Sequence, residues 1–127
     1  MHAYMPRILV VEDEALVRLA LCDFLESSGF RVLEACDGDR AVEVINRAGA
    51  GIDLVFTDVR MPGSLDGFAL ANWIHKHEPK LPVVITSGDI GKVDMRFELA
   101  PGEKFLPKPY SFDRLVGVFM DTLEAVY

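Results

Sequence analysis

The chain has 127 residues, of which 50% are hydrophobic and 26% are charged, and this length and composition suit one compact domain with a substantial core. Asp and Glu outnumber Lys and Arg by 20 to 13, which gives a formal net charge of −7 and argues against binding to nucleic acid or anionic membranes through bulk electrostatics. We therefore expect a single domain over residues 1–127 that binds neither directly.

Segments typical of strands and of helices alternate along the chain. A buried strand is expected at 7–11, and a helix is expected at 14–28, ending before Gly29. The apolar side chains of this helix recur at helical spacing and predict its buried face: Val17, Ala20, Leu21, Phe24 and Leu25.

The alternation continues to the C-terminus. Segment 89–102 is expected to hold a short or irregular helix, because Gly91, Pro101 and Gly102 interrupt it. Ser111 is expected to cap the last helix, which runs to about residue 125. The other expected elements are strands at 31–34, 53–57, 83–86 and 103–106 and helices at 39–48 and 67–77.

Strands that alternate with helices predict right-handed crossovers and a mainly parallel, doubly wound sheet with helices on both faces. In such sheets, ligands bind outside the carboxyl ends of the strands. Polar residues follow four of the apolar runs at that edge. They are therefore expected to line one crevice: Glu12, Asp13, Asp58, Ser87 and Lys108.

These residue types indicate a site for a divalent cation and a phosphoryl group. Clustered carboxylates repel one another unless a cation neutralises them, and Mg²⁺ suits a site with few carboxylates. Asp58 is the candidate nucleophile, because a carboxylate can accept a phosphoryl group. Lys108 would neutralise the transferred group, and Ser87, beside the small Gly88, would donate a hydrogen bond to it.

Taken singly, several of these residues have ordinary structural explanations. Glu12 and Asp13 suit a helix N-terminus, Ser87 suits a turn, and Lys108 suits an exposed surface. Asp58 favours the interpretation as a binding site, because a further acid at a strand end is hard to explain by helix capping. Prolines on both sides of Lys108 favour it too, since they fix the direction of the chain and make the Lys108–Pro109 bond a candidate cis peptide.

The cysteines and the N-terminal residues favour a cytoplasmic location. Cys22 and Cys36 fit no metal-ligand spacing and do not require a disulfide, so a reducing compartment is expected. The first seven residues lack the layout of a signal peptide. No apolar run approaches the length of a membrane span.

The ordered set of these segments resembles the receiver domain of two-component response regulators (CheY-like). The resemblance covers almost the whole chain and implies a flavodoxin-like fold of five parallel strands, in the order 2-1-3-4-5, with about five helices. The segments that carry it are 9–13 (LVVED), 53–58 (DLVFTD) with 61–63 (MPG) and 66–67 (DG), 82–88 (PVVITSG) and 105–109 (FLPKP).

The resemblance also implies roles for the acidic residues. Asp58 would accept a phosphoryl group from a phosphohistidine, carried by a sensor histidine kinase or a histidine phosphotransfer protein. Asp13 and Asp58 would bind Mg²⁺ directly, together with the main-chain carbonyl of Arg60. Glu12 would act on the ion through a water.

The remaining implied roles concern the response to phosphorylation. Ser87 and Lys108 would contact the phosphoryl group, and Phe105 stands at the position of a switch aromatic that turns inward when Ser87 moves. A plain core aromatic is the equal alternative for Phe105. The fourth helix, fifth strand and fifth helix would form the face that responds, to bind an unidentified downstream protein or to form a dimer.

The first helix carries a candidate docking patch for the kinase. Leu16, Leu19 and Cys22 lie outside the predicted buried stripe, and the resemblance implies that this helix faces the phosphotransfer domain of the kinase. Incidental exposure of apolar residues is the alternative.

Two other functions fit the residues less well. A Mg²⁺-dependent phosphatase with an aspartyl phosphate needs a general acid two residues after the nucleophile, where this chain has Arg60. A flavin-binding domain needs a phosphate-cradling loop after the first strand, where Glu12, Asp13 and Glu14 carry the wrong charge. We therefore expect a signalling module, on its own or within a longer protein, that acts only on its own aspartyl phosphate rather than an enzyme.

Overall fold

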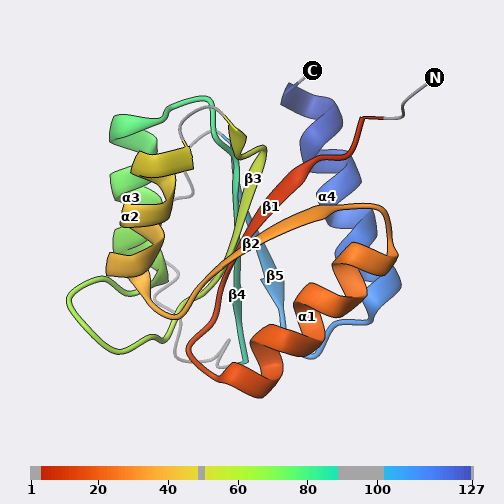
Figure 1. Cartoon of the computed structure of the whole chain (residues 1–127), viewed down its shortest axis with the longest axis horizontal. Coiled ribbons are helices and arrows are strands. Elements are labelled where there is room, and N and C mark those ends of the chain that lie inside the picture. The colour runs from red at the N-terminus through yellow and green to blue at the C-terminus, as the bar shows by residue number, and fades with distance from the viewer. Residues whose placement is uncertain (1–3, 49–50, 89–101, 127) are drawn as a thin grey trace.

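The computed structural model describes residues 4–48, 51–88 and 102–126. In this part of the chain, five strands form one parallel sheet in the order β2-β1-β3-β4-β5 (Figure 1). This order and the doubly wound class confirm the prediction. The strands are β1 (Arg7–Val11), β2 (Arg31–Ala35), β3 (Leu54–Asp58), β4 (Val83–Ser87) and β5 (Glu103–Pro107).

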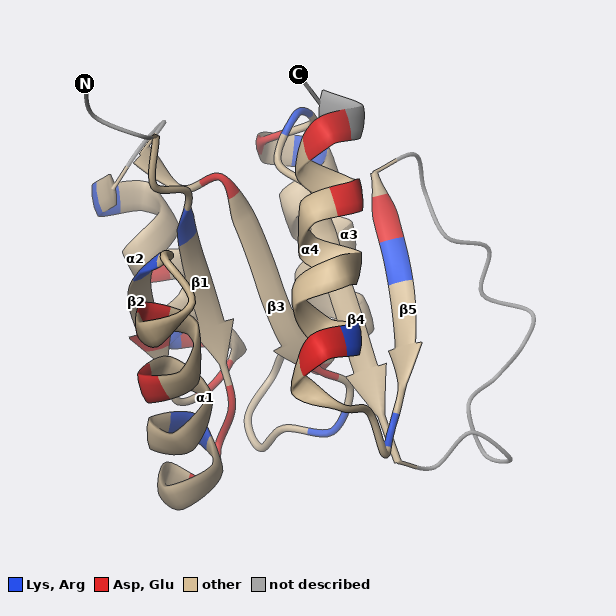
Figure 2. Ribbon diagram, turned by 90° about the vertical axis from the view of Figure 1, so that its right-hand side faces the viewer, with Lys and Arg blue, Asp and Glu red and all other residues tan. Residues whose placement is uncertain are grey.

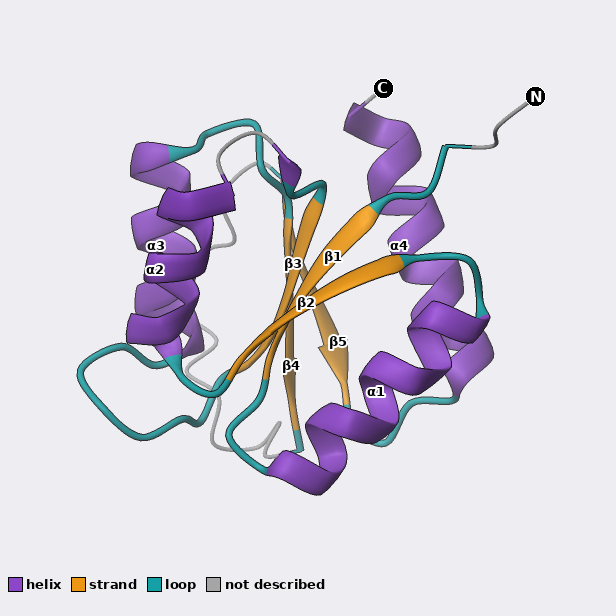
Figure 3. Ribbon diagram, in the orientation of Figure 1, coloured by secondary structure: helices purple, strands orange, loops and turns teal. Residues whose placement is uncertain are grey.

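Helices cover both faces of the sheet (Figure 3). Two of them, α2 (Gly38–Ala48) and α3 (Gly67–His77), lie on one face, and α1 (Ala15–Ser27) and α4 (Phe112–Val126) lie on the other. These four helices are the ones found among the described residues, where about five were expected. The additional helix was predicted in segment 89–102, of which residues 89–101 lie outside the described part.

The apolar runs form strands because both of their faces are buried. In β1, Ile8 and Val10 pack in the core beneath α1 and α4, while Leu9 and Val11 pack in the core beneath α2 and α3. All four are 0–1% exposed, as expected for a parallel strand covered on both sides. The two cores together hold the sheet between its helical layers.

The register of the strands places the site residues side by side. Val11 of β1 is opposite Thr57 of β3, so the residues that follow, Glu12 and Asp58, leave the sheet together. On the other side, Asp58 is opposite Thr86 of β4, and Ser87 is opposite Pro107 of β5, which precedes Lys108. The carboxyl ends of four strands therefore supply the site, as the alternation predicted.

The buried face of α1 differs from the prediction. Val17 and Ala20 are exposed, whereas Cys22 is only 4% exposed and packs in the core with Leu21 and Leu25. The expectation that Cys22 belongs to a surface patch is therefore wrong. The reason is that the buried residues of α1 all lie in its second half, so this helix contacts the sheet over only part of its length.

Local features end the elements where the sequence predicts. Gly29 follows α1 with a φ of +97°, the left-handed conformation that favours glycine at a helix end. The hydroxyl of Ser111 accepts a hydrogen bond from the backbone N–H of Arg114 at 3.0 Å, as expected for a helix cap. The Lys108–Pro109 peptide bond is cis.

None of the helices in the described ranges has both the length and the apolar character needed to cross a membrane.

Candidate functional site

Asp58 is the last residue of β3, and both of its carboxylate oxygens have partners. Its Oδ2 accepts a hydrogen bond from Lys108 Nζ at 2.6 Å, within an ion pair. Its Oδ1 accepts a longer bond of 3.3 Å from the backbone N–H of Arg60. The side chain of Asp58 is 12% exposed, and it lines an open cavity. A carboxylate placed in this way is oriented and accessible to a reagent.

Lys108 is held at the edge of the sheet by its own backbone. Its N–H donates to the carbonyl of Ser87 at 3.0 Å, which joins the ends of β4 and β5. Burial alone would lower the pKa of Lys108, but the hydrogen bond and charge of Asp58, with the nearby charge of Glu12, raise it instead. Lys108 therefore stays an ammonium and supplies a fixed positive charge beside Asp58.

Glu12 is buried, with an exposed fraction of 5%. Burial is the largest cause that raises its pKa, to about 7, and the charge of Asp58 raises it further. The backbone N–H of Glu14, which donates to Glu12 Oε1 at 3.2 Å, opposes this effect. The raised pKa shows that the site destabilises a further negative charge, which a bound cation would offset.

One open cavity of about 460 Å³ joins all five of the strand-end residues predicted to converge. Asp13 is exposed at its rim, and Ser87 is 3% exposed. Figure 2 shows acidic residues in the loop after β1 and a basic segment after β5 at the same end of the sheet. The cavity is lined by Glu12, Asp13, Glu14, Asp58, Arg60, Ser87, Gly88 and Lys108.

The carboxylates in this cavity fit a magnesium ion that keeps several of its waters. In the described ranges, no group of three or more His, Cys, Asp or Glu side chains forms a preformed metal cage. Mg²⁺ does not need one, because it typically binds through one or two carboxylates and retains water. Asp13 and Asp58 line the cavity together, and the raised pKa of Glu12 reflects the repulsion and burial that an ion would relieve.

Other predicted residues lie away from this cavity. Phe105 of β5 is half-buried and packs against the core beneath α2 and α3, and its role as a switch stays a prediction. Leu16 and Leu19 are 83% and 50% exposed on α1. They are compatible with a docking surface, which also stays a prediction.

Sequence reasoning missed two contributors to the site. Glu14 lines the cavity, and its position directly after Glu12 and Asp13 was the available signal. Arg18 donates from Nη1 to the main-chain carbonyl of Glu12 at 2.8 Å, and so supports the acidic loop from α1. Nothing in the sequence marks Arg18 for this contact.

The described residues define a doubly wound α/β domain with an acidic crevice and the Lys108 ammonium at the carboxyl edge of its sheet. Residues 8–119 match the family described as "Response regulator receiver domain". This match covers most of the chain, which therefore belongs to the response regulator receiver family.

Similar proteins agree with this assignment. The sensor kinase CckA of Brucella abortus (strain 2308) is 35% identical over 118 residues, which cover 92% of this chain and 12% of that kinase. A crystal structure of the receiver domain from the hybrid histidine kinase CckA has a TM-score of 0.79 at 35% identity, and covers 92% of this chain and 98% of the other. The response regulator TrrA of Thermotoga maritima, in complex with Mg²⁺ and BeF, has a TM-score of 0.80 at 28% identity, with 93% and 99% covered. The chain thus spans only a small part of the curated kinase that it matches.

Proposed function

We propose that this chain is a phosphorylation switch, in which Asp58 accepts a phosphoryl group from a phosphohistidine of a sensor histidine kinase or a histidine phosphotransfer protein. The observation that carries the proposal is the contact of 2.6 Å between Lys108 Nζ and Asp58 Oδ2, within one cavity that all the strand-end residues share. This contact fixes a nucleophile and a counter-charge in one place. Family membership adds support, since relatives include a sensor kinase and transcriptional regulators.

The proposed transfer is a displacement at phosphorus. A carboxylate oxygen of Asp58 forms the new P–O bond, the P–N bond to the histidine breaks, and its electron pair stays on the imidazole nitrogen. Lys108 then contacts the added oxygens, and the hydroxyl of Ser87 donates a hydrogen bond to them. The preorganised ammonium requires no rearrangement of charge during the transfer.

Asp13, Asp58 and the main-chain carbonyl of Arg60 would hold Mg²⁺, and Glu12 would act through a water. Bound Mg²⁺ would offset the negative charge of the phosphoryl group and of the carboxylates. A neighbouring family member has been crystallised with Mg²⁺ and BeF, which supports this assignment. The chain's own part is to keep Asp58 oriented through Lys108 and the N–H of Arg60.

The response would reach the surface through β4 and β5. Ser87 and Lys108 lie at the ends of these neighbouring strands, joined by the Lys108 N–H to Ser87 carbonyl bond. Phe105 lies three residues before Lys108, in β5. We propose that β5, the last helix and the segment before β5 form the face that meets a downstream protein, in a cytoplasmic signalling module that spans residues 1–127.

Docking to the phosphodonor is proposed at the exposed start of α1. Leu16 and Leu19 are exposed apolar residues on a helix that begins directly after the acidic loop. A partner that covers them would lie beside the cavity that contains Asp58. Cys22 has no part in this surface, because it is buried.

The first experiment tests phosphorylation by mass. The protein is incubated with Mg²⁺ and acetyl phosphate, and its intact mass is measured; a single phosphoryl adduct is expected. The adduct should be lost in Asp58→Asn and kept in Asp23→Asn, a matched change at an exposed position of α1. An adduct that persists in Asp58→Asn would show that Asp58 is not the acceptor. If the protein forms no adduct and also fails to bind beryllofluoride, the proposed switch is refuted.

The second experiment tests the propagated response. Backbone amide spectra with and without Mg²⁺ and beryllofluoride should differ beside Asp58 and also at Phe105 and in α4. Shifts that stay beside Asp58 would contradict the proposed output face while leaving phosphorylation intact.

A further inference from the structure

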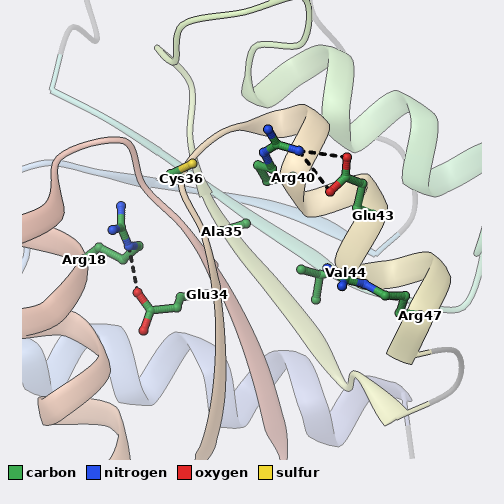
Figure 4. A pocket seen from close by; sticks show the side chains of 8 residues that line it. All are labelled: Arg18, Glu34, Ala35, Cys36, Arg40, Glu43, Val44 and Arg47. Carbon is green, nitrogen blue, oxygen red and sulfur yellow. Dashed lines mark hydrogen bonds and ion pairs between the residues drawn. The ribbon is translucent and has the colours of Figure 1, made fainter.

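A second cavity, of about 280 Å³, lies at the opposite edge of the fold from β5, between α1, β2 and α2 (Figure 4). Arg18 reaches it from α1 and Glu34 from β2. On α2, Arg40, Glu43 and Arg47 line it from successive turns, because residues three and four apart share a helix face. The proposed phosphorylation site uses none of these side chains directly.

This cavity gathers cations on an acidic protein. Three of the 13 Lys and Arg side chains of the chain line it, against two glutamates, while the chain as a whole carries −7. Guanidinium groups present several N–H donors in a planar fork, which suits phosphate and carboxylate oxygens. The lining side chains carry one net positive charge, which favours an anion there.

The existing ion pairs leave donors available. Arg18 Nε binds Glu34 at 2.8 Å, and Arg40 Nη1 binds Glu43 at 2.9 Å; each guanidinium has five N–H groups, so both keep further donors. Within the part of the chain that the structure describes, Arg47 makes no hydrogen bond or ion pair. Figure 4 shows Arg47 and Arg40 on α2, across the cavity from Arg18 and Glu34.

The charge already present selects the kind of anion. A ligand carboxylate would offer the arginines no more than Glu34 and Glu43 do, and its association would cost translational freedom that the glutamates have already lost. A phosphate group carries close to two charges at neutral pH and three strong acceptor oxygens. We propose that the cavity between α1 and α2 binds a small molecule that bears phosphate groups, through Arg40, Arg47 and the free donors of Arg18.

Arg18 links this cavity to the acidic loop. Its Nη1 donates to the main-chain carbonyl of Glu12 at 2.8 Å, and the N–H of Glu12 donates to the carbonyl of Ala35, which also lines the cavity, at 3.1 Å. A ligand that draws on Arg18 therefore acts on the main-chain carbonyl of Glu12. Any such effect is reciprocal, so ligand binding and occupation of the acidic cavity would change each other's affinity.

The test uses inorganic pyrophosphate as the probe, without Mg²⁺ and in the presence of EDTA, at constant ionic strength. The amide signals of Cys36, Val44 and Arg47 are followed in ¹⁵N spectra. Saturable shifts at these residues, and at Glu12 through Arg18, are expected. Acetate at the same ionic strength should not produce them.

Variants separate the site from bulk electrostatics. Arg47→Gln and Arg40→Gln should each weaken pyrophosphate binding about tenfold, the effect of one charge-assisted hydrogen bond. Lys76→Gln, which removes the same charge from an exposed position of α3, should leave the affinity unchanged. Equal weakening by Lys76→Gln, equal shifts with acetate, or no saturable shift at millimolar pyrophosphate would overturn the proposal.

The same titration of the Asp58→Asn protein keeps this inference independent of the proposed function. Pyrophosphate should bind that variant as it binds the unmodified chain. An anion in the acidic cavity would instead bind Asp58→Asn more tightly, because that change removes the carboxylate paired with Lys108. Tighter binding by this variant would therefore place the anion in the acidic cavity and refute the second site.

Discussion

The buried carboxyl of Glu12 makes the stability of this domain depend on pH in an unusual direction. Burial and the charge of Asp58 raise its pKa from 4.5 to about 7. Below about pH 4.5 the group is protonated in both the folded and unfolded chains, so it does not change the free energy of unfolding. As pH rises to 7, the unfolded chain loses this proton and the folded chain keeps it. Stability should therefore fall over this window. The fall is at most about 3 kcal/mol, at 1.36 kcal/mol for each pH unit between the two pKa values, because solvent in the open cavity screens part of the charge.

Replacing Glu12 by Gln should remove this loss. Glu12→Gln keeps an oxygen that can accept from the N–H of Glu14 but carries no charge. Its stability gain over the unmodified chain should therefore grow from pH 4.5 to 7 and then level off at no more than about 3 kcal/mol. The assay is urea denaturation at several pH values, with EDTA to remove Mg²⁺. Glu26→Gln, at an exposed position of α1, serves as the control for the loss of an acidic side chain. A difference between Glu12→Gln and the unmodified chain that stays flat from pH 4.5 to 8 would refute the reasoning.

Three further outcomes are expected. Gly67→Ala should destabilise the fold by about 1–3 kcal/mol or more in urea denaturation, because a Cβ there would clash with the carbonyl oxygen of Asp58. Gly117→Ala, with open space around it in α4, should instead stabilise the fold by about 0.5–1 kcal/mol. Mg²⁺ at 100 times its dissociation constant should raise the free energy of unfolding by about 2.7 kcal/mol. Asp13→Asn should greatly reduce this gain. An equal gain in both proteins would show that Asp13 is not part of the metal site. Leu19→Asp should slow phosphotransfer from the kinase but not from acetyl phosphate, and equal slowing of both reactions would contradict docking at α1.

Most of the fold could be predicted from local patterns. The short apolar runs become strands because both of their faces are covered. Burial on both faces requires a continuous apolar run, and each segment shows this pattern by itself. Helix ends were equally local, as Gly29 and Ser111 show. The order of the strands came from the resemblance to a family, because alternation of strands and helices alone does not determine which strands are neighbours.

The face of α1 could not be predicted in the same way. A helical stripe gives the direction of the apolar residues but not the length over which the helix touches the sheet. Val17 and Cys22 show the consequence, since the first was expected to be buried and is exposed, and the second was expected to be exposed and is buried. The angle and offset between α1 and the sheet decide this, and they depend on every element in that layer.

The sequence by itself determined that acids, a hydroxyl and an ammonium gather at one edge of the sheet, because the carboxyl ends of parallel strands must meet there. Only the tertiary structure decided which of these groups pair. Asp58 and Lys108 are 50 residues apart in the chain and 2.6 Å apart in space, and the charges of these same two residues act on the pKa of Glu12 although both are distant from it in sequence. Charge and burial act through space. The sequence therefore predicts which groups take part in the site, whereas the folded structure determines which of them pair and which are protonated.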